Sequence, residues 1–236
     1  MKYGGVFVTR DILRDTVKSV QDLTRARVLV GIPRANAPRE GEQEVNNAML
    51  GYVHEFGSPA QKIPARPHLV PGVKKIEPQI IKLMTKTAQD ALTAGSKGQS
   101  KNERDREIDK TLNKVGLACV AAIQGIIRTG IPPGLAESTL KARARRKPGR
   151  GIGISKGAKA ELAYRSAHPE AGASITSTTP LIDTGEYWRK ITYIIDRLGT
   201  YAKGVAPSAD SLILGTDNRI IDNRAVKTGE LPLQKP

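Results

Sequence analysis

The stretch VNNAMLGYVHEFGSPAQKIPARPHLVP, residues 45–71, decides the expected fold because it joins two contrasting patterns. Its first half has the apolar period of an amphipathic helix. Gly57 follows in the position of a helix C-cap, and Pro59 prevents the helix from continuing. The second half carries three prolines within residues 63–71. Since proline and the residue before it disfavour helix, this half predicts a stiff extended segment.

Further regular elements are predicted on both sides of this stretch. Residues 10–24 have apolar side chains at helical spacing, and residues 27–32 (RVLVGI) form a β-branched strand pattern. The helical period returns over residues 76–92 and again up to Gly130, across a polar hinge at 95–102. Two long helices around a short hinge predict a helical hairpin over residues 76–130.

The last third of the sequence changes character. Residues 141–178 are crowded with Lys and Arg among glycines and few apolar anchors, which predicts a long, flexible basic arm. A turn is expected at 183–185 and a strand at 188–195, because that run is rich in β-branched residues. One or two more strands are expected over 201–214, and the tail at 227–236 is expected to be frayed.

Composition sets the fold class and the kind of neighbour. The chain has 236 residues, of which 39% are hydrophobic and 4% aromatic, so the core is thin. We expect a single α+β domain over residues 1–236, with a mixed or antiparallel sheet packed against long helices. A thin core on this length favours long loops or a fold completed by neighbouring subunits. The net charge of +15 favours a polyanionic neighbour, although a merely basic surface would give the same value.

Few residue types in this chain suit metal or cofactor chemistry. Cys119 is the only cysteine, which excludes an intrachain disulfide. The three histidines are scattered, no acidic cluster has metal-ligand spacing, and no nucleotide-binding glycine loop follows a strand. We therefore expect no metal and no cofactor. The first nine residues lack the apolar core of a signal peptide, and no apolar run approaches about 18 residues, so we expect no membrane partner and folding in a reducing cytoplasm.

Two motifs suggest chemistry that has to be weighed against simpler roles. Asp183-Thr184-Gly185 follows an apolar run, as in aspartic peptidases, but a three-residue match is more typical of a turn with a positive-φ glycine. The basic arm could follow a phosphate backbone or order against an acidic partner subunit, and both readings stay open. Because Tyr164 is its only aromatic residue, any DNA contact would be electrostatic and non-specific. The candidate DNA or acidic-partner contacts are Arg143, Arg145, Arg146, Lys147 and Arg150.

Three segments together carry a family resemblance. The first is AMLGYVHEFG (48–57) with IPARPHL (63–69), the second is LAESTLKAR (135–143), and the third is PLIDTGEYWRKIT (180–192). In this order they resemble the signature segments of phage tail-completion and virion-morphogenesis proteins, which include head–tail neck and minor tail proteins. The resemblance covers roughly residues 25–200. His68 stands where the family usually has Phe, and Tyr187 where it usually has Leu.

The resemblance implies an α+β structural subunit of a tailed-phage virion, without catalytic activity. It would join the tail to the head connector as a homo-oligomeric ring, often six-fold, with DNA passing through. Its partners would be tail terminator or tail tube proteins and head connector proteins, in a virion assembled in the host cytoplasm. The expected subunit-interface residues are Glu55, Phe56, Gly57, Ile63, Arg66, Pro67, Asp183, Thr184, Gly185 and Trp188.

Two further points stay open from the sequence alone. Glu55 and Arg66 could form a polar lock at the interface or an ordinary solvated pair. The alternative functions are a basic, non-specific nucleic-acid-binding protein and, more remotely, an aspartic-type peptidase built on Asp183.

Overall fold

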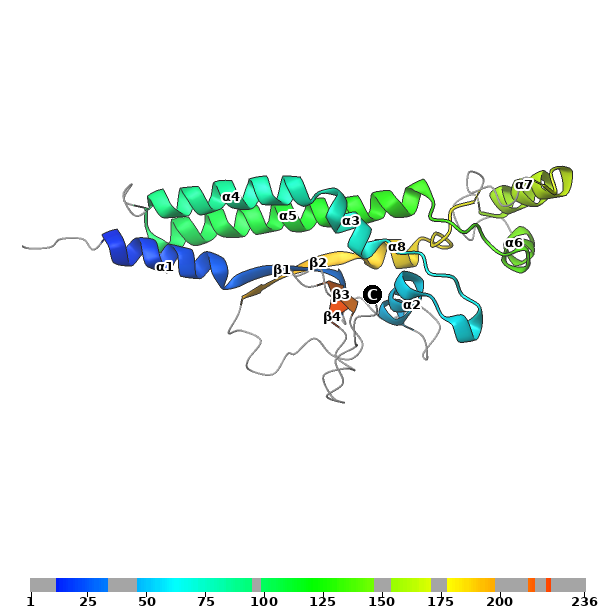
Figure 1. The fold of residues 1–236 in the computed structure, drawn as a ribbon, viewed down its shortest axis with the longest axis horizontal. Coiled ribbons are helices and arrows are strands. Elements are labelled where there is room, and N and C mark those ends of the chain that lie inside the picture. The colour runs from blue at the N-terminus through cyan, green and yellow to red at the C-terminus, as the bar shows by residue number, and fades with distance from the viewer. Residues whose placement is uncertain are drawn as a thin grey trace, which may run out of the picture.

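The chain folds into an elongated α+β structure with a long helical hairpin lying along a small sheet (Figure 1). The expected α+β fold class is therefore confirmed. This is a computed structural model, and it describes residues 12–33, 46–94, 99–146, 154–170, 178–197, 212–214 and 220–221.

The sheet is antiparallel, and its strands lie in the order β2-β1-β3-β4. The inner strand β1 (Ala26–Ile32) pairs along its length with β2 (Thr192–Arg197) and on its other side with β3 (Leu212–Leu214). The short β4 (Ile220–Ile221) forms the far edge. The strand predicted at 27–32 is confirmed with one added residue.

Three helices pack against one another on one side of the sheet, and the longest of them lies directly against β1 and β2. Helix α1 (Ile12–Thr24) leads into β1, and α4 (Glu77–Ala94) with α5 (Lys101–Thr129) forms the predicted hairpin (Figure 1). A capping box starts α5, because the Ser100 hydroxyl accepts a hydrogen bond from the Glu103 backbone N–H at 3.3 Å, while a Glu103 oxygen accepts from the Ser100 N–H at 2.7 Å.

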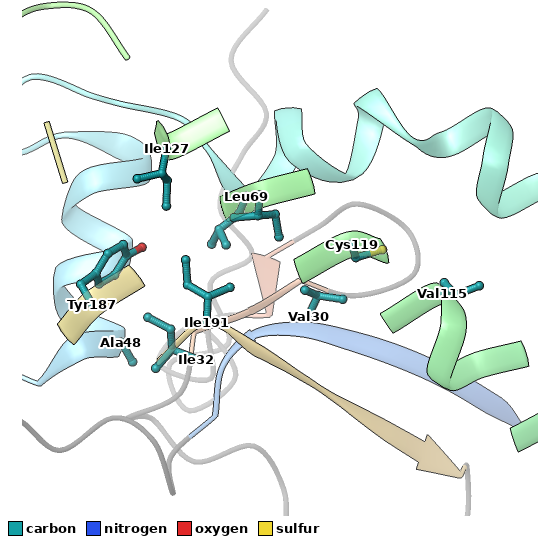
Figure 2. Packing of buried hydrophobic residues seen from close by; sticks show 10 residues of the cluster. Val30, Ile32, Ala48, Leu69, Val115, Cys119, Ile127, Tyr187 and Ile191 are labelled. Carbon is teal, nitrogen blue, oxygen red and sulfur yellow. The ribbon is translucent and has the colours of Figure 1, made fainter. Parts of the chain in front are cut away.

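The core lies between α5 and the sheet and is made largely of aliphatic side chains (Figure 2). Val30 and Ile32 of β1 meet Ile123 and Ile127 of α5, together with Leu69. Burial of these side chains is the main term that holds the layers together.

The proline-rich segment is extended only at its beginning. Helix α2 (Asn47–Phe56) ends at Gly57 as predicted, a 3-10 turn follows (Pro59–Gln61), and helix α3 covers Leu69–Lys75. The prediction of an extended chain up to Pro71 is therefore wrong for its last three residues. Pro71 is tolerated because it lies in the first turn of α3, where backbone N–H groups have no partner within the helix.

The basic segment 141–178 is not one long loop. It contains the end of helix α6 (Glu137–Ala144) and all of helix α7 (Ile154–Ala167), which pack on each other at one end of the molecule (Figure 1). Leu135, Leu140 and Ala158 form a small core between them. The predicted loop is wrong because its Lys, Arg and Ala residues are good helix formers and few apolar side chains are needed for so small a core.

The strand predicted at 188–195 begins later than expected. Residues 186–190 form the short helix α8 (Glu186–Lys190), and β2 starts at Thr192. The turn predicted at 183–185 is confirmed, with Gly185 at φ 76° before α8. The predicted tail at 227–236 and most of the segment 201–214 lie outside the described residues. Among the helices that the structure describes, none is long and apolar enough to cross a membrane.

Candidate functional site

The three segments that carry the family resemblance meet around one groove. The groove has a volume of about 800 Å³ and is lined by residues from 47–66, 134–143 and 181–187. Its lining residues come from α2 and the segment after it, from the chain around the start of α6, and from the turn that leads into α8. Segments more than 100 residues apart in the chain therefore form a single surface.

Glu55 fixes α3 to α2 at the base of this region. Its carboxylate accepts hydrogen bonds from the backbone N–H groups of His68 at 2.7 Å, Leu69 at 3.0 Å and Val70 at 3.2 Å. The residue is only 5% exposed. A buried carboxylate is stabilised by such donors, and the N-terminal turn of a helix supplies them.

His68 and Tyr187, the two departures from the family pattern, contact each other in the core. The Nδ1–H of His68 donates to the Arg66 carbonyl at 2.9 Å, since a carbonyl can only accept. Nε2 of His68 then accepts a short hydrogen bond from the Tyr187 hydroxyl. Burial lowers the pKa of His68 and raises the pKa of Tyr187, so both are neutral at pH 7.

His54 lines the groove beside this pair. Its ring lies edge-on to Tyr187, with the centroids 5.8 Å apart. Burial is the main cause that lowers the pKa of His54 from 6.5 to about 4, and the neighbouring His68 and Arg66 side chains add to the effect. Its Nδ1 atom is buried and has no hydrogen-bond partner within the described structure. The imidazole is therefore neutral at pH 7.

Arg66 joins the extended segment to the chain before α6. Its guanidinium donates to the Pro133 carbonyl at 2.9 and 3.1 Å and to the Gly134 carbonyl at 3.2 Å. The residue is 6% exposed. Glu55 and Arg66, considered above as a pair, are thus each occupied with backbone groups, and both lie inside the subunit.

Asp183 connects the third segment to α6. Its two carboxylate oxygens lie 2.6 Å from Nη1 of Arg146, and one lies 3.5 Å from Nε of Arg143. Two of the expected DNA contacts therefore pair with an expected interface residue. An aspartic peptidase needs a second carboxylate close to the first; the charged groups that the structure pairs with Asp183 are guanidinium groups.

Some of the other expected interface residues are exposed to solvent, and the rest are at least partly covered. Phe56 is 52% exposed and packs its ring on Tyr52, with centroids 4.8 Å apart. Pro67 and Thr184 are exposed as well. Ile63, Gly57, Gly185 and Trp188 are covered to different degrees, and they shape the backbone or pack on neighbouring elements.

Gly57 and Trp188 show how these covered residues act. Gly57 has φ 78°, and a Cβ there would lie 2.8 Å from the backbone nitrogen of Ala65, so the extended segment can approach α2 only at a glycine. Trp188 holds α8 on α5, since its backbone carbonyl accepts from Gln124 at 3.2 Å and its ring lies 4.7 Å from the guanidinium carbon of Arg128.

The remaining expected DNA contact within the described structure is Arg145, which is exposed at the end of α6. Lys147 and Arg150 lie outside the described residues. The sequence did not indicate the burial of Arg143, which is 7% exposed, or the bond from Asn47 to Glu186 at 3.0 Å. The only sequence feature that singled out both His68 and Tyr187 was that each differs from the residue usual in the family that the chain resembles.

Within the described residues no group of three His, Cys, Asp or Glu side chains could hold a metal ion. In the comparisons with known proteins, no family model, curated protein or solved structure matches this chain.

Proposed function

We propose that the protein is a non-enzymatic structural subunit of a tailed-phage virion, a tail-completion or neck protein that joins the tail to the head connector as a ring around the DNA path. One observation carries the proposal: the three segments that resemble this family, separate in sequence, line one groove. A chance resemblance in three short segments gives no reason for them to share a surface.

The contact between His68 and Tyr187 supports the same reading. These positions were identified from two different segments as the places where the chain departs from the family, and their side chains form a buried hydrogen bond. Replacing Phe and Leu at touching positions by His and Tyr keeps a buried pair satisfied, whereas either replacement alone would leave a polar group without a partner.

The exposed aromatic pair on α2 gives the proposed ring a contact surface. Phe56 and Tyr52 are 52% and 42% exposed, and Met49 on the same helix is 39% exposed. Large apolar side chains grouped on a surface are typical of protein–protein contacts. Each subunit of a ring presents two different surfaces to its neighbours, and this helix face would be one of them.

The first test is the mass of the purified protein by light scattering at low and moderate salt, with and without duplex DNA. We expect a ring of several subunits, or a monomer that forms one only with its virion partners. Phe56→Ser should weaken the ring, whereas Leu117→Ser, a 60% exposed control on α5, should not. In virions, Arg66→Ala and Trp188→Ala should block assembly; normal assembly of both variants would contradict the proposal.

The second candidate function is non-specific nucleic-acid binding. The net charge of +15 and the exposed cations Arg145, Lys156 and Lys159 on the α6–α7 end favour it. It predicts that the isolated monomer binds duplex DNA and loses most of that affinity between about 50 mM and about 200 mM salt. Fluorescence anisotropy with a labelled duplex measures both quantities. Tight binding by a monomer that never forms a ring would favour this candidate.

A further inference from the structure

The groove holds more positive than negative charge. Three cations line it, Lys62, Arg66 and Arg143, together with two acids, Asp183 and Glu186. Each acid is already engaged: Asp183 binds Arg146 through both oxygens at 2.6 Å, and Glu186 accepts a hydrogen bond from Asn47 at 3.0 Å. The cations that line the groove are therefore only partly compensated by the chain itself.

Of the two buried arginines that line the groove, Arg143 is the one with fewer partners. It is 7% exposed, and among the described residues it makes one ion pair, at 3.5 Å to Asp183, and no hydrogen bond. A guanidinium has five N–H donors, and within the described structure those of Arg143 have no hydrogen-bond acceptor. Burial lowers the pKa of Arg143, Asp183 raises it, and the nearby charges of Arg146 and Arg66 lower it further.

Arg66 also has N–H groups that donate no hydrogen bond within the described structure. Its hydrogen bonds within the described structure use Nε and Nη2, which leaves Nη1 without an acceptor there. Arg66 and Arg143 are 6% and 7% exposed as residues, and both line the same groove. An oxyanion placed between them would accept charge-assisted hydrogen bonds from two arginines at once.

We propose that this groove is a binding site for a carboxylate, carried by an acidic segment of a partner protein and held between Arg66 and Arg143. The walls of the groove fit a peptide, because Leu50, Pro64 and Leu135 add apolar surface beside the two cations. A duplex backbone is contacted mainly by exposed Lys and Arg side chains, and among the described residues Lys62 is the only exposed Lys or Arg that lines the groove. That the partner is a protein rests on the proposed function; the oxyanion site does not.

The test is isothermal titration of the full chain with hexaglutamate and, separately, with single-stranded hexathymidylate at the same low salt. We expect hexaglutamate to bind the wild-type protein and to bind Arg143→Gln about ten- to a hundredfold more weakly. The matched control is Arg145→Gln, two residues further along the chain, whose side chain is exposed and does not line the groove. Its affinity should stay within about twofold of wild type.

A second variant covers the case in which Arg143→Gln does not fold. Thr139→Trp keeps every charge and places a bulky side chain at a position that lines the groove, so it should also abolish hexaglutamate binding. The inference is overturned if wild-type protein ignores hexaglutamate, if Thr139→Trp binds normally, or if Arg145→Gln loses as much affinity as Arg143→Gln. Hexathymidylate binding that depends on Arg143 more strongly than hexaglutamate binding would overturn the choice of a protein partner.

These outcomes separate the groove from the proposed function. A protein that forms the ring but ignores hexaglutamate refutes the carboxylate site and leaves the structural role standing. A protein that binds hexaglutamate through Arg143 but neither forms a ring nor joins virions supports the site and refutes the role.

Discussion

Replacing Glu55 by alanine should destabilise the whole fold. The carboxylate accepts three backbone N–H groups, and two of the donors belong to residues that are 0% exposed, His68 and Leu69. Each buried donor left without an acceptor costs about 1–3 kcal/mol, so the two together cost about 4 kcal/mol. For a chain of this length that loss corresponds to a fall in melting temperature of about 8–16 °C.

Thermal unfolding followed by circular dichroism measures this shift directly. The control is Glu137→Ala, because Glu137 is exposed and its carboxylate binds Lys141 one helical turn away, at 2.6 Å. That variant should melt with the wild-type protein. If Glu55→Ala melted within about 3 °C of wild type, the three N–H groups would have other acceptors, and Glu55 would not fix α3 to α2.

Three further predictions concern the same region. His68→Phe and Tyr187→Leu should each destabilise the protein, and the double variant should recover at least about 1 kcal/mol relative to their sum, as measured by urea unfolding; simple additivity would refute the pairing. The pKa of His54 is about 4 in the folded chain and 6.5 when unfolded, so the unfolded state binds more protons between these values. The free energy of unfolding should therefore fall as the pH drops from about 6.5 to about 4. In His54→Gln, the urea midpoint should depend less on pH over this range. An unchanged slope would show that His54 does not cause the pH dependence. Gly57→Ala should cost at least about 2 kcal/mol, because φ is 78° and a Cβ would lie 2.8 Å from a backbone nitrogen. Its control is Gly125→Ala, where a Cβ would have nothing within 4 Å, and equal stability of the two variants would contradict the argument.

The sequence predicted well the helices and strands that bury one face made of aliphatic side chains. The stripe on α5 and the run in β1 were recognisable because each buries a regular set of aliphatic residues in the common core. The end of α2 was recognisable for a different reason: Gly57 supplies a backbone conformation that other residues rarely adopt.

Helix α7 was missed because its buried face is not apolar. Glu161 is 0% exposed and pairs with Arg165 at 3.0 Å, so two charged residues occupy covered positions that periodicity analysis expects to be hydrophobic. Ala158 supplies much of the remaining contact. A helix that packs through alanine and an ion pair gives almost no amphipathic signal.

The arrangement of the site depends on contacts that no local pattern encodes. The family resemblance brought Glu55 and Arg66 to attention, but it could not show that each side chain would bind backbone groups instead of the other. The meeting of three segments around one groove needed α8 to pack on α2 and Arg66 to bind the chain before α6, and both are tertiary contacts.

Under the proposed function, the three-part groove also has a consequence for the order of events during assembly. Its walls come from residues 47–66, 134–143 and 181–187, so a growing or partly folded chain cannot present it. A partner that recognises this surface would engage finished subunits and ignore incomplete ones. Since binding to the folded state alone adds RT ln(1 + [L]/Kd) to its stability, the same contact would also retain the subunits that it selects. One binding event would then both select the folded subunits and retain them in the assembly.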